Sequence, residues 1–215
     1  MTASLVEAPD LGKLLDRGLG ELGVSLTREA RSTLLEFLHI IEKWNRVYNL
    51  TAIRDGARMV SVHLLDCLAT VPHLPGSRLV DLGSGAGFPG IPIAVAKPEV
   101  SVTLLDSSHK KAAFLRQAAS ELQLENVSVV CERVENWHPA ARFDCIVSRA
   151  YAELTEFVTS SSHLLAPGGV FASMKGLHPF EEIDRLPRGF RVSKITKLEV
   201  PMLAAERHLV LIEPV

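Results

Sequence analysis

The stretch LVDLGSGAGFPG, residues 79–90, decides the fold that the sequence predicts. Its apolar segment LVDL runs into a loop with glycine at positions 83, 85, 87 and 90. A strand that ends in glycines and turns into a helix lets backbone approach a ligand closely, because no Cβ atom intervenes. In an open parallel sheet this turn marks the point where the strand order reverses, and ligands bind there. The stretch therefore predicts a ligand site, against the plainer alternative of a glycine-rich connection.

Short apolar segments alternate with helical segments from residue 77 onward. Strands are expected at RLVDLG, VSVTLLD, VSVVCERV, FDCIVSRA and GVFASMKG, with helices near 90–97, 108–123 and 151–165. This alternation predicts right-handed crossovers and a mostly parallel sheet with helices on both faces. Segments 191–199 and 206–213 lack an intervening helix and predict an antiparallel pair at one sheet edge. The expected fold class is α/β with a seven-stranded sheet.

Residues 1–76 are expected to form helices only. Apolar residues recur at steps of three and four over 27–44, with Thr27 as the N-cap, and a second helix is expected around 57–70. Pro72 and Pro75-Gly76 mark the boundary. The sequence thus predicts an N-terminal helical extension over 1–76 and a ligand-binding domain over 77–215.

Composition excludes several classes of protein. The chain has 215 residues, 47% of them hydrophobic, which excludes wholesale disorder. No apolar run approaches the roughly 18 residues of a membrane span, and the acidic first ten residues do not resemble a secretory signal. Three cysteines without CxxC spacing argue against a disulfide framework or a metal site and fit the cytoplasm. A net charge of −2 gives no sign of a nucleic-acid partner.

The glycine loop alone leaves its ligand open. Gly85-x-Gly87-x-x-Gly90 matches the dinucleotide pattern, and Gly83-x-Gly85-x-Gly87 matches that of S-adenosylmethionine binders. A dinucleotide places its pyrophosphate on free N–H groups at the helix N-terminus. Pro89 and Pro92 fall in that first turn and have no N–H to donate. The prolines therefore favour S-adenosylmethionine, which has no phosphate.

Three further residues follow later strands and suit an adenosine. Asp106 ends the next strand, where a carboxylate accepts hydrogen bonds from both ribose hydroxyls; its alternative role is to cap the following helix. Val134 can pack on the adenine while Glu135 meets its exocyclic amine. A solvated charge cluster at the strand end explains these two residues equally well.

Basic residues end the fourth and fifth strands. Arg149 can pair with a cofactor carboxylate or with an RNA phosphate, and Lys175 is interpreted in the same way. An ordinary surface position is the alternative for both. Together they predict an anionic substrate beside the adenosine site.

Several motifs together resemble one known family. They are WNRVYNLT at 44–51, HLLD at 63–66, DLGSGAGFPGIP at 81–92, LLDSSHKKAAFLRQ at 104–117, VSRA at 147–150 and ERHL at 206–209. The chain resembles the glucose-inhibited division protein B family from about residue 30 to 213. These are bacterial methyltransferases that act on guanine N7 in 16S ribosomal RNA. Phe88, where many relatives carry Leu, and Ala86, where some carry Pro, depart from the family pattern without changing the chemistry.

The resemblance implies a fold and a set of site residues. The fold is a Rossmann-like class I S-adenosylmethionine-dependent methyltransferase with an N-terminal helical extension. The implied catalytic or RNA-contacting residues are Arg133, Arg149 and Lys175. Cofactor contacts are expected at Gly83, Gly85, Gly87, Phe88, Asp106, Val134, Glu135 and Arg149, and no metal is expected. The implied partner is 16S ribosomal RNA, expected within the 30S subunit, and the protein is expected to be a monomer.

The polar residues of the helical extension allow two interpretations, a structural one and a catalytic one. His63 and Asp66 are one helical turn apart, close enough to share a hydrogen bond. A structural polar cluster with Asn45, Asn49 and Thr51 is favoured over acid–base catalysis. Trp44 and Tyr48 can stack on a base, but at helical spacing a role in the core is favoured.

The implied target atom predicts a mechanism. Guanine N7 carries a lone pair and no proton, so it attacks a methyl group without a general base, and catalysis is mainly alignment. RNA contacts are expected from Arg185, Arg188, Arg191, Lys194 and Lys197. A short-chain reductase is excluded because Tyr-x-x-x-Lys is missing. A small-molecule methyltransferase and a non-catalytic adenosine-binding module remain alternatives.

Overall fold

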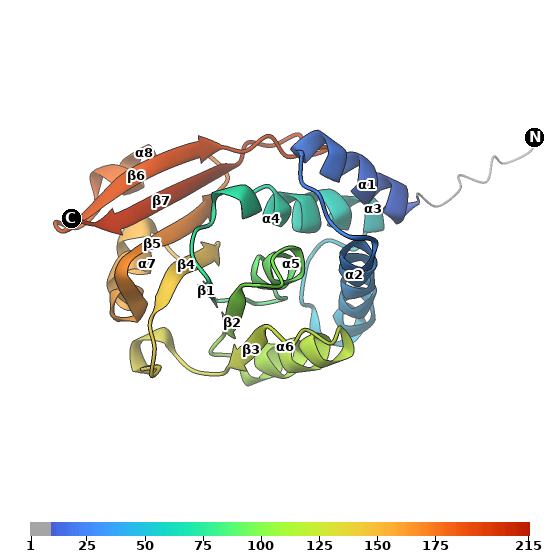
Figure 1. Ribbon diagram of the computed structural model, residues 1–215, viewed down its shortest axis with the longest axis horizontal. Coiled ribbons are helices and arrows are strands. Elements are labelled where there is room, and N and C mark those ends of the chain that lie inside the picture. Colours follow the sequence, from blue (N-terminus) through green and yellow to red (C-terminus); the bar gives the residue numbers. More distant parts are fainter. Residues whose placement is uncertain (1–9) are drawn as a thin grey trace, which may run out of the picture.

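A single mixed sheet of seven strands organises the protein (Figure 1). The computed structural model describes residues 10–215. The strand order is β3-β2-β1-β4-β5-β7-β6. The strands are β1 (Arg78–Leu82), β2 (Ser101–Leu105), β3 (Val127–Val130), β4 (Phe143–Arg149), β5 (Leu165–Lys175), β6 (Phe190–Lys197) and β7 (His208–Pro214).

Pairing in the sheet is parallel from β3 to β5 and antiparallel beyond it. In the parallel part Asp81 of β1 pairs with Leu104 of β2 and Val147 of β4. β7 pairs with both β5 and β6 in antiparallel register, so β6 is the edge strand. The predicted mostly parallel seven-stranded sheet with an antiparallel edge is confirmed. Because the order reverses between β1 and β4, the predicted ligand loop after β1 lies at the switch point.

Helices cover the sheet on both faces, as Figure 1 shows. The helices are α1 (Leu11–Leu22), α2 (Arg28–Tyr48), α3 (Gly56–Met59), α4 (Asp66–Leu68), α5 (Gly90–Ala96), α6 (His109–Glu121), α7 (Leu154–Ser161) and α8 (Phe180–Asp184). A π-helical turn, Val60–Leu65, joins α3 to α4. The predicted cap of α2 is confirmed, since Thr27 Oγ1 accepts a hydrogen bond from Ala30 N–H.

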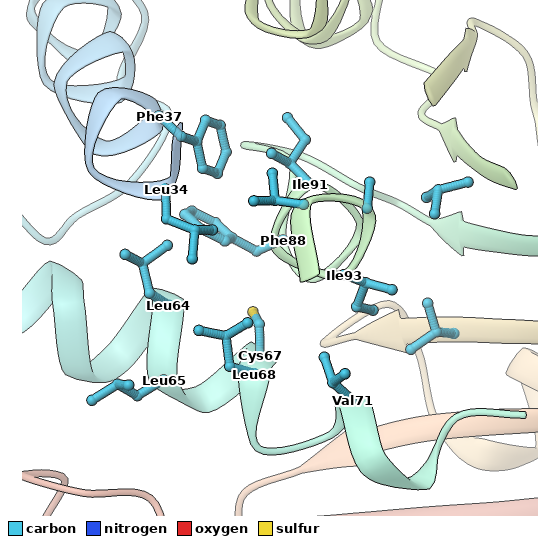
Figure 2. Packing of buried hydrophobic residues seen from close by; sticks show 14 of the residues in the cluster. Leu34, Phe37, Leu64, Leu65, Cys67, Leu68, Val71, Phe88, Ile91 and Ile93 are labelled. Atoms are coloured by element: carbon cyan, nitrogen blue, oxygen red, sulfur yellow. The ribbon is translucent and has the colours of Figure 1, made fainter. Parts of the chain in front are cut away.

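Each face of the sheet has its own hydrophobic core. One core joins α1, α2, the π-helical turn and α4 to α5, α6 and one face of the strands. Figure 2 shows Leu34 and Phe37 of α2 and Leu64 of the π-helical turn gathered around Phe88 and Ile91. The second core packs α7 against the other face. Residues on both sides of position 76 share the first core, and the division into two domains stays a prediction.

Among residues 10–215, no helix combines the length and apolar character that crossing a bilayer requires. The prediction that the first ten residues are not a secretory signal falls on residues 1–10, of which only Asp10 is among the described residues.

Candidate cofactor and active site

The carboxyl ends of three parallel strands and the turn after β3 surround a cavity of about 380 Å3. It lies at the switch point between β1 and β4, where the glycine loop predicts a ligand. The lining residues are Leu82, Gly83, Leu105, Asp106, Ser107, Lys111, Glu132, Arg133, Val134, Glu135, Ala150, Tyr151 and Glu156.

The glycine loop uses its backbone N–H groups inside the protein. Residues 83 and 84 donate to the carbonyl of Leu105, and residues 87 and 88 donate to the carbonyl of Ser84. Gly85 N–H donates to the carboxylate of Asp106 at 3.0 Å. Five N–H groups of residues 83–88 are therefore bonded within the protein, and these bonds hold the loop in its conformation.

The N-terminus of α5 has no N–H group left for a phosphate. Gly90 N–H donates to Oδ2 of Asp81 at 2.9 Å, and Ile91 N–H donates to the carbonyl of Gly87. The third helical residue is Pro92, which has no N–H. In addition, a carboxylate already occupies the end of the helix where a diphosphate would bind. This geometry supports the prediction from Pro89 and Pro92 that the loop does not bind a diphosphate.

Two glycines of the loop are required by close packing. A Cβ atom on Gly90 would collide with Leu104 and lie 2.8 Å from Oδ2 of Asp81. Gly83 has a φ of +67°, and a Cβ there would lie 3.0 Å from the ring of Tyr151. Tyr151 therefore approaches the loop only because residue 83 has no side chain.

Asp81 is a buried carboxylate that the sequence reasoning did not select. Burial raises the pKa of its carboxyl to about 7, although the hydrogen bond from Gly90 N–H lowers it. Its Oδ1 atom is buried and has no hydrogen-bond partner among the described residues. A buried carboxylate oxygen without a partner beside the glycine loop fits a cationic group such as the ammonium of S-adenosylmethionine. An acidic residue inside an otherwise apolar strand was the signal available in the sequence.

Asp106 does not cap α6. Ser108 is the N-cap, and its Oγ accepts from Lys111 N–H. The two oxygens of Asp106 accept from Gly85 N–H and Ser108 N–H, and Lys111 Nζ lies 3.7 Å away. Since each carboxylate oxygen has a second lone pair, Asp106 can still accept hydrogen bonds from a ribose at the cavity wall.

Arg149 is held by the N-terminal helices and does not line the cavity. Its Nη1 donates to the carbonyl of Val62 at 3.1 Å and lies 3.5 Å from Oδ2 of Asp66. Its guanidinium lies over the ring of Phe88, 4.8 Å from the ring centroid. Phe88 itself is 3% exposed and belongs to the core. These contacts connect the end of β4 to the segment 60–68.

Asp66 and His63 belong to different hydrogen-bonded pairs. Oδ1 of Asp66 accepts from Arg207 Nε at 3.0 Å, while Oδ2 faces Arg149. His63 Nε2 shares a hydrogen bond of 2.9 Å with Thr51 Oγ1, and His63 Nδ1 is buried with no partner in the part of the chain that the structure describes. The hydrogen bond that the spacing of His63 and Asp66 allows is therefore not formed, because each residue finds another partner. Burial, with the Arg149 charge, lowers the pKa of His63 to about 4.

Lys175 is also paired within the chain. Its Nζ donates to Glu182 Oε2 at 2.7 Å and to the carbonyl of Ala152 at 3.1 Å. The same Glu182 oxygen accepts from Leu154 N–H. Lys175 therefore connects the loop after β5 to the segment that follows Tyr151, and its charge is compensated.

The structure brings only some predicted site residues together. Gly83, Asp106, Arg133, Val134 and Glu135 line the cavity. The others do not line it; they are Gly85, Gly87, Phe88, Arg149 and Lys175. Sequence reasoning missed the lining residues Tyr151, Lys111 and Glu156. It also missed Asp81, which lies beside the glycine loop outside the cavity lining and is the one of the four that stands out by pattern.

Three of the five basic residues predicted to contact RNA in the stretch 185–197 form ion pairs within the chain. Arg185 lies 3.5 Å from Glu153, and Lys197 lies 3.5 Å from Glu199. The remaining ion pair is between Arg191 and a glutamate of the neighbouring strand. Its role in RNA binding stays a prediction.

The strand order and the cavity define a class I S-adenosylmethionine-dependent methyltransferase fold. A solved structure, that of the glycopeptide N-methyltransferase MtfA complexed with S-adenosylmethionine, aligns with a TM-score of 0.61 at 14% identity. The alignment covers 71% of this chain and 87% of that one and shows the shared fold.

Sequence comparison is more specific. The GidB family model, rRNA small subunit methyltransferase G, matches residues 30–210, so the chain belongs to that family. It is 51% identical over 201 residues to ribosomal RNA small subunit methyltransferase G of Laribacter hongkongensis, covering 94% of this chain and 97% of that protein. It is 53% identical over 197 residues to the protein of the same name from Chromobacterium violaceum, covering 91% and 94%.

Proposed function

We propose that the protein transfers a methyl group from S-adenosylmethionine to N7 of a guanine in 16S ribosomal RNA. The observation that carries this proposal is the cavity at the switch point of the sheet. The N-terminus of α5 beside it cannot bind a phosphate, because Gly90 N–H already donates to the carboxylate of Asp81. Membership in a family of rRNA small subunit methyltransferases gives the substrate class. We also propose that the protein acts as a monomer in the cytoplasm, on RNA within the 30S subunit.

The lining residues suit an adenosine ligand. In this proposal Asp106 accepts hydrogen bonds from the ribose hydroxyls, Val134 packs on the adenine and Glu135 meets its exocyclic amine. Asp81 receives the ammonium group, whose charge matches its unpartnered oxygen. S-adenosylmethionine supplies the methyl group on a sulfonium.

The chain's own residues position the reactants and need not remove a proton. Guanine N7 attacks with its lone pair, so the residues that matter hold the base and exclude water. His63 fits no role as a base, since it is bound to Thr51 and its pKa is lowered to about 4. Arg133 is proposed to meet RNA at the rim, and Gly85, Gly87 and Phe88 to shape the cofactor loop. Arg149 and Lys175 are proposed to hold segments 147–154 and 175–182 in place.

The test is methyl transfer to defined acceptors. Radiolabelled S-adenosylmethionine is incubated with the protein and either 30S particles, protein-free 16S RNA or small metabolites, and the product is identified by mass spectrometry. We expect label in 16S RNA as 7-methylguanine. Label in a metabolite would indicate a small-molecule methyltransferase, and cofactor binding without transfer would indicate a binding module.

A matched pair of variants tests the site. Asp106→Asn should weaken cofactor binding in calorimetry, whereas Glu99→Gln makes the same chemical change at an exposed position of the opposite sheet edge and should leave binding unchanged. Equal behaviour of the two variants would refute the assignment of Asp106.

A further inference from the structure

An exposed aromatic ring belongs to the first residue of α8, within the loop segment 176–184 that follows β5. Phe180 is 70% exposed, and its neighbour in the loop, Leu177, is 75% exposed. Phe180 is the most exposed of the phenylalanine, tyrosine and tryptophan side chains among residues 10–215. Its ring is therefore open to an external contact and does not belong to the core.

Two histidines support the ring from behind. The ring centroids of His178 and Phe180 are 3.8 Å apart, and His178 packs edge-on against His208 at 5.5 Å. His208 belongs to β7, is buried, and makes a hydrogen bond of 3.1 Å with the carbonyl of Gly176. Phe180 is thus fixed on one side by the sheet, while the rest of its ring is open to solvent.

The loop is attached to the wall of the candidate active site. Glu182 joins it to Lys175 and to the N–H of Leu154, and Lys175 also binds the carbonyl of Ala152. Residues 150 and 151, directly before this segment, line the cavity. The segment that carries Phe180 is therefore connected through Glu182 and Lys175 to the chain that continues from the cavity wall.

Tyr48 is also an exposed aromatic residue, but other side chains of the protein already contact its ring. The ring of Tyr48 already has Trp44 stacked on it at 5.1 Å, and Lys110 Nζ lies 4.5 Å from its centroid. Its faces are therefore occupied by the protein itself. Phe180 is the better stacking surface, since its only aromatic contact within residues 10–215 is His178.

We propose that Phe180 is a stacking platform for an unpaired RNA base next to the target guanine. The proposal rests on the proposed function and names the part of the substrate that this loop recognises. Single-stranded bases stack on aromatic side chains in a manner that tolerates sequence, and each such contact is worth about 1–3 kcal/mol. Glu181 and Asp184 of α8 are exposed and acidic, so the contact proposed here is with a base and not with a phosphate.

The test measures methyl transfer and its salt dependence for substitutions of Phe180. Phe180→Ala and Phe180→Leu should raise KM for 16S RNA about 5- to 100-fold, the equivalent of about 1–3 kcal/mol, with kcat and cofactor affinity unchanged. Phe180→Trp and Phe180→Tyr should stay within about twofold of the wild type. Because stacking releases no counterions, the slope of affinity against salt concentration should be the same in all variants. Val215→Ala, an exposed apolar position at the chain end, serves as the control for lost apolar surface.

Fluorescence gives a direct readout of stacking. Bound 16S RNA should quench the indole of Phe180→Trp beyond the quenching seen in the wild type, which has Trp44 and Trp137. An unchanged KM in Phe180→Ala, or rescue by Phe180→Leu, would overturn the proposal. A loss confined to 30S particles, with normal action on protein-free RNA, would indicate a protein partner and also overturn it. If the wild type methylates neither 30S particles nor protein-free 16S RNA, the proposed function is refuted, whatever the Phe180 variants do.

Discussion

Replacing Asp81 by Asn should remove a pH-dependent cost to stability. The carboxyl is fully buried and burial raises its pKa to about 7. Within residues 10–215 only one of its oxygens has a hydrogen-bond partner. Asn has the same shape, its amide oxygen can accept from Gly90 N–H, and it carries no charge. The variant therefore isolates the effect of ionising this group.

The sign and size follow from the two pKa values. The folded protein holds this proton more tightly than the unfolded chain, whose ordinary value is 3.8. The contribution of Asp81 to the free energy of unfolding is fully present below pH 3.8 and is lost as pH rises to about 7. About three pKa units at 1.36 kcal/mol each give a total of about 4 kcal/mol, of which about 2–3 kcal/mol falls between pH 5 and pH 8.

Urea unfolding of the wild type and Asp81→Asn at pH 5, 6, 7 and 8 measures this effect. The free energy of unfolding of the variant minus that of the wild type should increase with pH and level off above pH 7. The difference is the relevant quantity, because His63 contributes a pH dependence of opposite sign. A difference that is flat with pH, or that falls, would refute the reasoning. We also expect Asp81→Asn to bind S-adenosylmethionine more weakly, so the stabilised variant should be the poorer enzyme.

Three further substitutions test other parts of the structure. The pKa of His63 in the folded protein is lowered to about 4, so its contribution to the free energy of unfolding is present above pH 6.5 and is lost as pH falls towards 4. His63→Gln should therefore make the free energy of unfolding depend less on pH between 6.5 and 4. Gly90→Ala should lower the free energy of unfolding by about 1–3 kcal/mol in urea titration, because its methyl group collides with Leu104. Asp106→Asn should raise the Kd for S-adenosylmethionine by about 10- to 100-fold in calorimetry, since a charged acceptor contributes about 1.5–3 kcal/mol. For each substitution, a variant with the same pH dependence, free energy of unfolding or Kd as the wild type would refute the prediction made for it.

The sequence predicted the local features of this fold well. Thr27 caps α2 as its position before an amphipathic segment indicates, and the glycine loop meets the switch point. Both depend on patterns within a few residues or on alternation along the chain. The short helix α8 was not predicted, because FEEID is too brief to show helical periodicity.

Long-range partners could not be predicted from the sequence. Asp66 and Arg207 are separated by 141 positions, and no local pattern indicates that they meet. The same holds for Arg149, whose place at a strand end predicted a ligand contact, although in the structure it binds segment 60–68. Charge and position suggest what a side chain can do, but its partner is fixed only by the packing of the whole chain.

The core that α2 and the π-helical turn share with the sheet has a consequence for biosynthesis. These helices leave the ribosome before β1 and α5 exist, so Leu34, Phe37 and Leu64 lack Phe88 and Ile91 as packing partners during early translation. The same core also includes residues of β2, β4, β5 and β7, so part of this apolar surface stays uncovered on the nascent chain until Leu209 has emerged. Nascent chains halted before and after that point should differ sharply in their resistance to protease.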